Sequence, residues 1–156
     1  MAPRKSAILF FSTSDSTRSQ MAQGFFRAWA DPQFAAVSTA VEASKINPRT
    51  AEIIQEAGID ISGQKPRTVK ESFRQHFVVV IAMCEIPRER CPIWPFSRNV
   101  FTWNIHDPEA HGKLEDEIRK SLRKTREEIS AKVKELISET LPSLTSASHA
   151  VSAGKR

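Results

Sequence analysis

Short apolar segments alternate along the chain with stretches in which apolar residues recur every three or four positions. Residues 7–11 and 77–83 are unbroken apolar runs, a pattern that is typical of buried strands. Residues 34–40 and 99–103 are less uniformly apolar and predict two further strands. The pattern therefore predicts four strands, two of them fully buried.

Helical patterns separate these strands. After the first strand and its loop, five apolar side chains share one helical face, which predicts a core-facing helix: Met21, Ala22, Phe25, Phe26 and Trp29. Asn47 and Pro48 are typical of a helix start, and Gly58 is typical of a helix end. Residues 68–73 fit a short helix, and residues 114–141 fit a long amphipathic one. Because helices alternate with strands, we predict an α/β fold with a parallel sheet covered on both faces.

Length and composition narrow the class of protein. A chain of 156 residues with 40% hydrophobic content suits one domain, which we expect to span residues 1–141. Residues 142–156 are rich in Ser and Ala and predict a disordered tail. The two cysteines exclude a disulfide-built scaffold, and the sequence has no ligand spacing of a zinc site. We therefore expect neither a metal nor a cofactor.

Membrane and nucleic-acid partners are not expected either. The sequence has no run of about 18 apolar residues for a membrane helix, and residues 7–11 are too few for a signal-peptide core of about 7 to 15. We therefore predict a cytoplasmic protein. The net charge of +5 permits an anionic partner, but basic residues on the long helix alternate with acidic ones and no RNA-binding motif appears.

The polar loop at residues 12–18 follows the first strand, at the sheet edge where parallel sheets bind ligands. A strand–loop–helix turn aims backbone N–H groups and a helix N-terminus at one point, which favours an anion. Arg18 can add two parallel hydrogen bonds to an oxyanion. The candidate anion-binding residues are Thr13, Ser14, Asp15, Ser16, Thr17, Arg18 and Ser19. The alternative is a polar turn in which Ser19 only caps the helix.

Several motifs, taken in chain order, resemble those of the low-molecular-weight protein tyrosine phosphatases, and more closely those of the related thioredoxin-coupled arsenate reductases. The family's anion loop is a cysteine, five residues, an arginine and a serine, and this chain has Ser12, Arg18 and Ser19 at those places. The other matching segments are Gln20-Met21-Ala22, Gly24, Asn47-Pro48-Arg49, residues 58–64, Cys84, residues 89–92, Trp103 and Asp107-Pro108. The resemblance covers residues 6–140 and implies a three-layer sandwich with a four-stranded parallel sheet.

The resemblance also implies roles for the site residues. Ser12 occupies the position of the catalytic nucleophile, Arg18 binds the oxyanion, and Asp107 protonates the leaving group. In the arsenate reductases the first cysteine attacks arsenate. Two further cysteines, here Cys84 and Cys91, then leave a disulfide for thioredoxin. The implied partners are an oxyanion such as phosphate, arsenate or sulfate, together with thioredoxin or a phosphorylated protein.

The anion loop departs from the family at more than one position. Ser12 replaces the cysteine, while Ser14 and Asp15 replace the glycine and asparagine that the family favours. A serine hydroxyl stays protonated where a loop cysteine becomes a thiolate, and Asp15 adds a negative charge that repels an oxyanion. We therefore expect a catalytically impaired, oxyanion-binding or regulatory member of the family. The alternative is an arsenate reductase or tyrosine phosphatase, natural or inactivated by substitution, that uses this loop with Cys84 and Cys91.

The cysteine pair itself has three interpretations. Cys84 and Cys91 are residues with no present role, a reversible disulfide that acts as a redox switch, or a two-thiol site for a soft metal or arsenite. Trp94 and Phe96 lie between prolines in the same loop and are predicted to form an exposed contact surface.

Overall fold

The computed structural model describes residues 6–13, 17–40, 45–65, 67–85, 94, 97, 99–108 and 114–144. Within these residues a five-stranded sheet has the order β3-β2-β1-β4-β5, and every neighbouring pair of strands is parallel. The strands are β1 (Ser6–Ser12), β2 (Phe34–Ala40), β3 (Arg67–Thr68), β4 (Val79–Met83) and β5 (Val100–Trp103). The predicted α/β class with a parallel sheet is confirmed. The sheet has one strand more than the four predicted, because the two-residue β3 is too short to produce a hydrophobic pattern.

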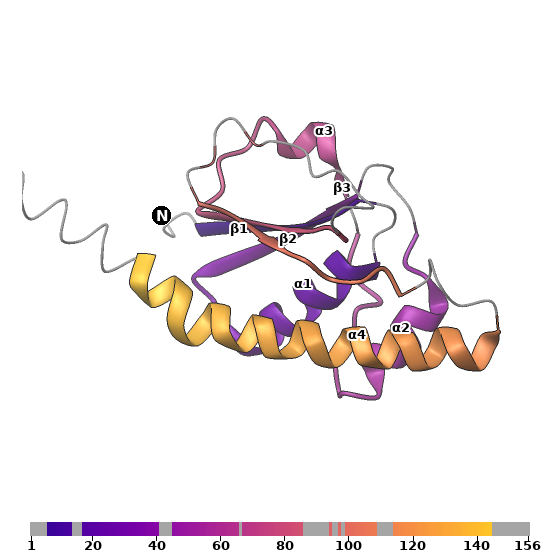
Figure 1. Cartoon of the computed structure of the whole chain (residues 1–156). Helices are drawn as coiled ribbons and strands as arrows, with labels where there is room; N and C mark the ends of the chain where they lie inside the picture. Colours follow the sequence, from indigo (N-terminus) through magenta and orange to yellow (C-terminus); the bar gives the residue numbers. More distant parts are fainter. Residues whose placement is uncertain are drawn as a thin grey trace, which may run out of the picture.

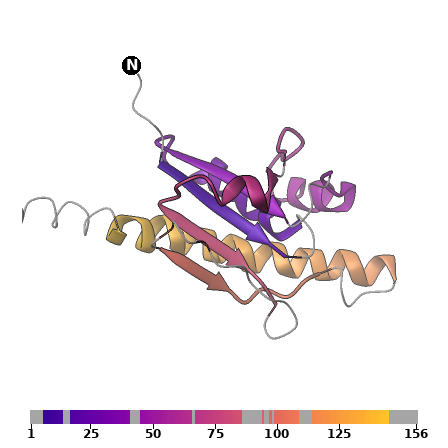
Figure 2. The same cartoon turned by 90° about the horizontal axis from the view of Figure 1, so that it is seen from above.

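Helices cover both faces of this sheet (Figure 1). The helices α1 (Thr17–Trp29), α2 (Pro48–Gln55) and α4 (Glu115–Glu135) lie on one face, and the short α3 (Val69–Ser72) lies on the other. Figure 2 shows α4 crossing beneath the strands, and together with the helical residues 136–144 it extends past both of their ends. The three layers agree with the architecture that the resemblance implied.

The long C-terminal helix passes its predicted end. Beyond α4, a π-helical turn, η1 (Leu136–Thr140), leads into backbone that stays helical through Leu144. Residues 145–156, which make up most of the predicted tail, lie outside the described residues. None of the helices in the described part of the chain combines the length and the apolar character that crossing a bilayer requires.

Successive side chains of β1 point to opposite faces of the sheet and join two separate hydrophobic clusters. Ile8 and Phe10 pack in the larger cluster, with residues of α1, α2 and α4. Leu9 and Phe11 pack in the smaller one, with Phe77. Every residue of β4 is buried as well. The two unbroken apolar runs are therefore central strands, as the sequence pattern indicated.

Two tryptophans lie differently from the predictions. Trp29, predicted in the core, is 39% exposed and is the last residue of α1. Its ring stacks on that of Phe25 and lies beneath Nζ of Lys134. Trp94, predicted on an exposed surface, is 4% exposed. Its ring centroid lies 5.0 Å from that of Phe11 and 5.6 Å from that of Phe73. The prediction failed because the Trp94 ring packs on two residues far away in the sequence, Phe11 of β1 and Phe73. Phe96 lies outside the described residues.

The predicted boundaries of α2 are confirmed. The side chain of Asn47 caps the helix by accepting a hydrogen bond from the N–H of Arg49 at 2.9 Å, and Pro48 occupies the first turn. After the helix, Gly58 has φ of +81°, a left-handed conformation that glycine adopts without strain. Local chemistry therefore determines both ends of this element.

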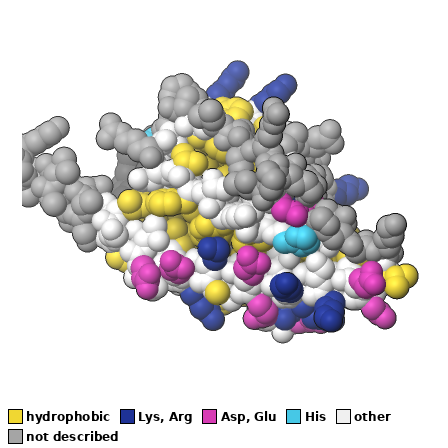
Figure 3. Space-filling view, viewed as in Figure 1, with side chains coloured by type: hydrophobic (Ala, Val, Ile, Leu, Met, Phe, Trp, Pro, Cys, Tyr) yellow, Lys and Arg dark blue, Asp and Glu magenta, His cyan; other side chains and the backbone are white. Residues whose placement is uncertain are grey.

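Ion pairs join α2 to α4 along the exposed side of the helical layer. Glu56 accepts hydrogen bonds from Arg123 at 3.0 Å and from Arg126 at 2.8 Å, and Glu52 accepts one from Arg119 at 2.9 Å. Figure 3 shows charged side chains of both signs mixed along this part of the surface. Side-chain hydrogen bonds from Arg123 and Arg126 lower the pKa of Glu56 from 4.5 to about 2.

The lowered pKa of Glu56 predicts a pH dependence of stability. A carboxyl group with a depressed pKa in the folded state stabilises the fold above its unfolded pKa. This contribution is fully present above pH 4.5 and is lost as the pH falls toward about 2. We expect the thermal midpoint of the unmodified chain to fall more steeply over this interval than that of Glu56→Gln. Thermal unfolding followed by circular dichroism checks this, with Glu117→Gln, at an exposed position of α4, as the control. Parallel curves for Glu56→Gln and the unmodified chain would contradict it.

Candidate functional site

The carboxyl end of β1 places Ser12 at the centre of the sheet edge. Ser12 pairs in register with Ala40 of β2 and Met83 of β4, and it is completely buried. Its Oγ donates a hydrogen bond to Oγ of Ser19 at 2.9 Å and accepts one from the N–H of Ser19 at 3.3 Å. Ser12 is thus fixed against the first turn of α1, where the helix dipole favours negative charge.

The helix begins earlier than predicted, at Thr17 rather than Ser19. Thr17 Oγ1 lies 3.2 Å from Thr50 Oγ1 of α2, a buried hydrogen bond that places the first residue of α1 against a neighbouring helix. Thr17, Arg18 and Ser19 are therefore buried first-turn residues and not loop residues. Among the other candidates, Thr13 is half-buried. Ser14, Asp15 and Ser16 lie outside the described residues.

Arg18 is a completely buried cation at this end of the sheet. Its Nη1 donates a hydrogen bond at 3.0 Å to the carbonyl oxygen of Ile105, in the loop that follows β5. Asp107, two residues further along that loop, is 4% exposed. The structure thus brings the Asp107 loop to the same carboxyl edge as Ser12 and Arg18, the edge at which the sequence predicted the 12–18 loop.

The first candidate redox residue lies at the same edge. Cys84 follows β4 directly, is completely buried, and is disulfide-bonded. Its N–H donates to the carbonyl oxygen of Trp103 at 3.3 Å. The sequence contains one other cysteine, Cys91, which lies outside the described residues.

Sequence reasoning did not single out Glu85 and could not place His106, and the structure brings the two together at this edge. Glu85 accepts a hydrogen bond from the backbone N–H of Asp107 through Oε2 at 3.1 Å, and its Oε1 lies 3.1 Å from Nδ1 of His106. Neither residue is part of a recognisable motif, because their partners come from loops more than twenty residues apart. The only available signal was their position, beside Cys84 and Asp107 respectively.

A buried network of amides, also missed, holds α1 behind the site. Ser38 Oγ accepts from Gln20 Nε2 at 2.9 Å and donates to Gln23 Oε1 at 2.6 Å. Gln64 Nε2 donates to the backbone oxygen of Gln20 at 3.1 Å and to Oε1 of Gln20 at 2.7 Å. Because buried polar groups are costly unless paired, this network favours one position of α1 relative to β2.

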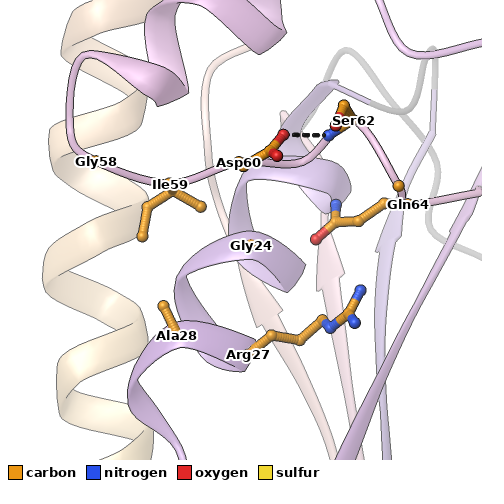
Figure 4. A pocket seen from close by; sticks show the side chains of 9 residues that line it. Gly24, Arg27, Ala28, Gly58, Ile59, Asp60, Ser62 and Gln64 are labelled. Atoms are coloured by element: carbon orange, nitrogen blue, oxygen red, sulfur yellow. Dashed lines mark hydrogen bonds between the residues drawn. The ribbon is translucent and has the colours of Figure 1, made fainter.

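Beside this network a polar hollow of about 510 Å³ opens between α1 and residues 58–64 (Figure 4). Gly24 lies at its inner wall. A Cβ atom at Gly24 would lie 2.7 Å from Cγ2 of Ile61 and 3.0 Å from Cγ2 of Ile59. The absence of a side chain at Gly24 therefore lets α1 approach this segment closely.

The close approach at Gly24 predicts that Gly24→Ala destabilises the fold. Overpacking against two buried isoleucines costs about 1–3 kcal/mol, which exceeds the gain in helix propensity of about 0.5–1 kcal/mol. We expect a net loss of about 1 kcal/mol in the free energy of unfolding, measured by urea denaturation. Gly63→Ala is the matched control, because its Cβ meets no atom within 4 Å. Equal stabilities of the two variants would rule out the close-packing explanation.

The described residues contain no group of three or more His, Cys, Asp and Glu side chains arranged to hold a metal ion. The site chemistry of the described residues therefore consists of a helix N-terminus, a buried guanidinium, hydroxyl groups, carboxylates, an imidazole and a disulfide. A helix N-terminus next to a buried arginine is suited to a tetrahedral oxyanion.

Comparisons with known proteins agree with this chemistry. The sequence model described as "Low molecular weight phosphotyrosine protein phosphatase" matches residues 7–147. An arsenate reductase of Halalkalibacterium halodurans is 30% identical over 130 residues, which is 83% of this chain and 94% of the relative. Two solved structures have similar folds. One, an arsenate reductase in the oxidized state, has a TM-score of 0.72 at 28% identity. The match covers 85% of this chain and 97% of that protein's chain. The other, an arsenate reductase in the phosphate binding state, has a TM-score of 0.70 at 27% identity. The match covers 86% of this chain and 98% of that protein's chain.

Proposed function

We propose a function from one established premise: this chain belongs to the low molecular weight phosphotyrosine protein phosphatase family. In this proposal it binds a tetrahedral oxyanion without turning it over efficiently. The site is the carboxyl edge of the sheet, between the first turn of α1 and the Asp107 loop. Arsenate reductases related to this chain, one of them solved in a phosphate binding state, support phosphate or arsenate as the anion.

The observation that carries the proposal is the hydroxyl group of Ser12 at the buried end of β1. A thiol there would be a thiolate beside a helix N-terminus and Arg18, whereas a hydroxyl keeps its proton. Ser12 Oγ donates to the neutral hydroxyl of Ser19, which is too weak a base to activate it. Ser12 is therefore suited to hydrogen bonding beneath an anion rather than to attacking it.

Arg18 and the start of α1 supply the attraction in this proposal. The guanidinium of Arg18 is buried and held in place by Ile105, so its charge is little screened by water. The backbone N–H groups of residues 13–18 would complete the anion site, and Ser14, Asp15 and Ser16 enter it on sequence grounds alone. The negative charge of Asp15 weakens the anion affinity relative to a loop with asparagine at that position.

Enzyme assays test the catalytic half of the proposal. We expect the unmodified chain to hydrolyse aryl phosphates no faster than Ser12→Ala, because neither has an activated nucleophile at position 12. Release of p-nitrophenol from p-nitrophenyl phosphate is the measurement. Turnover by the unmodified chain that is lost in Ser12→Ala would show that Ser12 is a functioning nucleophile, and the proposal would then be wrong.

The disulfide at Cys84 favours a second candidate function, a thiol–disulfide switch that uses Cys84 and Cys91. A dithiol protein of the thioredoxin type would supply two electrons and two protons, leaving two thiols on this chain and a disulfide on the partner. Mass spectrometry after alkylation checks this. Thioredoxin should convert a chain without free thiols into one with two, and a thiol count that thioredoxin does not change would argue against the switch.

A further inference from the structure

The side chain of Glu85 joins the loop that follows β4 to the loop that follows β5. Its Oε2 accepts a hydrogen bond from the N–H of Asp107 at 3.1 Å, and its Oε1 lies 3.1 Å from Nδ1 of the preceding residue, His106. A histidine that carries its hydrogen on Nδ1 donates to the carboxylate whether the ring is neutral or charged. The Glu85 side chain is 17% exposed and Asp107 is 4% exposed, whereas the His106 side chain is 49% exposed, so the contact with the Asp107 N–H is the better shielded of the two.

Arg18 holds the same loop from the other side. Its Nη1 donates to the carbonyl oxygen of Ile105, and the N–H of Ile105 donates to the carbonyl oxygen of Trp103 at 2.8 Å. The Ile105 side chain is completely buried. Ile105 is therefore fixed by Arg18 and by packing, whereas the next two residues are fixed by Glu85. Arg18 and Glu85 thus contact three consecutive residues of one loop, 105 to 107.

We propose that Glu85 is a positioning residue whose carboxylate sets the place of Asp107 relative to Arg18, an inference that rests on the proposed oxyanion site. Glu85 touches no anion in this role and acts through the backbone of Asp107. A hydrogen bond to an ionised acceptor is about twice as strong as a neutral one, so ionised Glu85 holds the loop more firmly than a neutral side chain would. The backbone N–H of the adjacent Cys84 donates to the carbonyl oxygen of Trp103, the last residue of β5 before this loop. Residues 84 and 85 therefore each make a hydrogen bond to the segment of residues 103–107.

Amide NMR of the unmodified, ¹⁵N-labelled chain tests the contact. The amide proton of Asp107 should move downfield as the Glu85 carboxyl ionises, and this titration step should vanish in Glu85→Gln. The other titratable groups at this contact, His106 and Asp107, are present in both proteins, so a difference between the two titrations comes from Glu85. Glu117→Gln, on the exposed side of α4, is the matched control and should keep every step. An Asp107 amide titration curve that is the same in Glu85→Gln and in the unmodified chain would overturn the proposal.

A phosphate titration of the same samples tests the link to the oxyanion site. Phosphate bound at Arg18 should shift the amides of both Ser19 and Asp107. In Glu85→Ala we expect the phosphate-induced shift of the Asp107 amide to fall at least threefold relative to that of the Ser19 amide. The reason is that Asp107 is no longer held in a fixed position relative to Arg18. An unchanged ratio would contradict positioning by Glu85. Absence of any phosphate shift at residues 13–19 in the unmodified chain would instead contradict the proposed function, while the ionisation step at Asp107 would still decide the role of Glu85.

Discussion

Replacing Ser12 by cysteine is expected to raise the hydrolysis of p-nitrophenyl phosphate by roughly a hundredfold or more. The new thiol would stand beside the first turn of α1 and the buried guanidinium of Arg18, both of which favour the thiolate. A thiolate attacks phosphorus directly, whereas the hydroxyl of Ser12 needs a base. Asp107, buried in the neighbouring loop, would protonate the leaving group.

The control for this experiment is Ser62→Cys, which places a thiol at an exposed position away from the sheet edge. It should leave the rate unchanged. If Ser12→Cys is inert but gains activity when Ser14→Gly and Asp15→Asn are added, the whole loop has diverged from an active form. If the triple variant is inert as well, the carboxyl edge does not retain the catalytic arrangement.

Arg18→Lys is expected to weaken phosphate binding about 10- to 100-fold, or about 1.4–2.8 kcal/mol. Lysine keeps the positive charge but loses the planar fork that makes two parallel hydrogen bonds to an oxyanion. It also loses the geometry with which Nη1 contacts the carbonyl oxygen of Ile105. Isothermal titration calorimetry with phosphate at fixed ionic strength measures the change.

Arg27→Lys serves as the matched control for this prediction. Arg27 lies on the same helix but in its last turn, at an exposed position. It should bind phosphate as the unmodified chain does, since any general effect of charge is equal in both variants. Equal affinities of Arg18→Lys and Arg27→Lys would show that Arg18 is not the anion-binding residue.

Much of this fold could be predicted because local patterns determine it. The apolar runs of β1 and β4 have the length and the β-branched and aromatic composition that are typical of buried strands. The cap at Asn47 and the positive φ at Gly58 depend on neighbouring residues alone. The motif around Arg18 likewise placed the candidate site at the carboxyl edge of the sheet, the edge at which the structure has Ser12 and Arg18.

The remaining features depend on contacts between distant segments. Trp94 contacts Phe11 and Phe73, which lie far from it in the sequence, so no local pattern indicates its burial. The contacts of Glu85 with residues 106 and 107 arise from the parallel pairing of β4 and β5. Such pairings are visible only when the topology is known, which is why the sequence identified Asp107 but not the residue that holds it.

The most direct test of the central claim is a titration of the unmodified chain with phosphate and arsenate, followed by backbone amide NMR. The account predicts saturable shifts at Thr13 and at the first turn of α1, with both anions and without hydrolysis of aryl phosphates. An absence of shifts up to about 10 mM anion, which corresponds to binding weaker than about −3 kcal/mol, would contradict an oxyanion site at this edge.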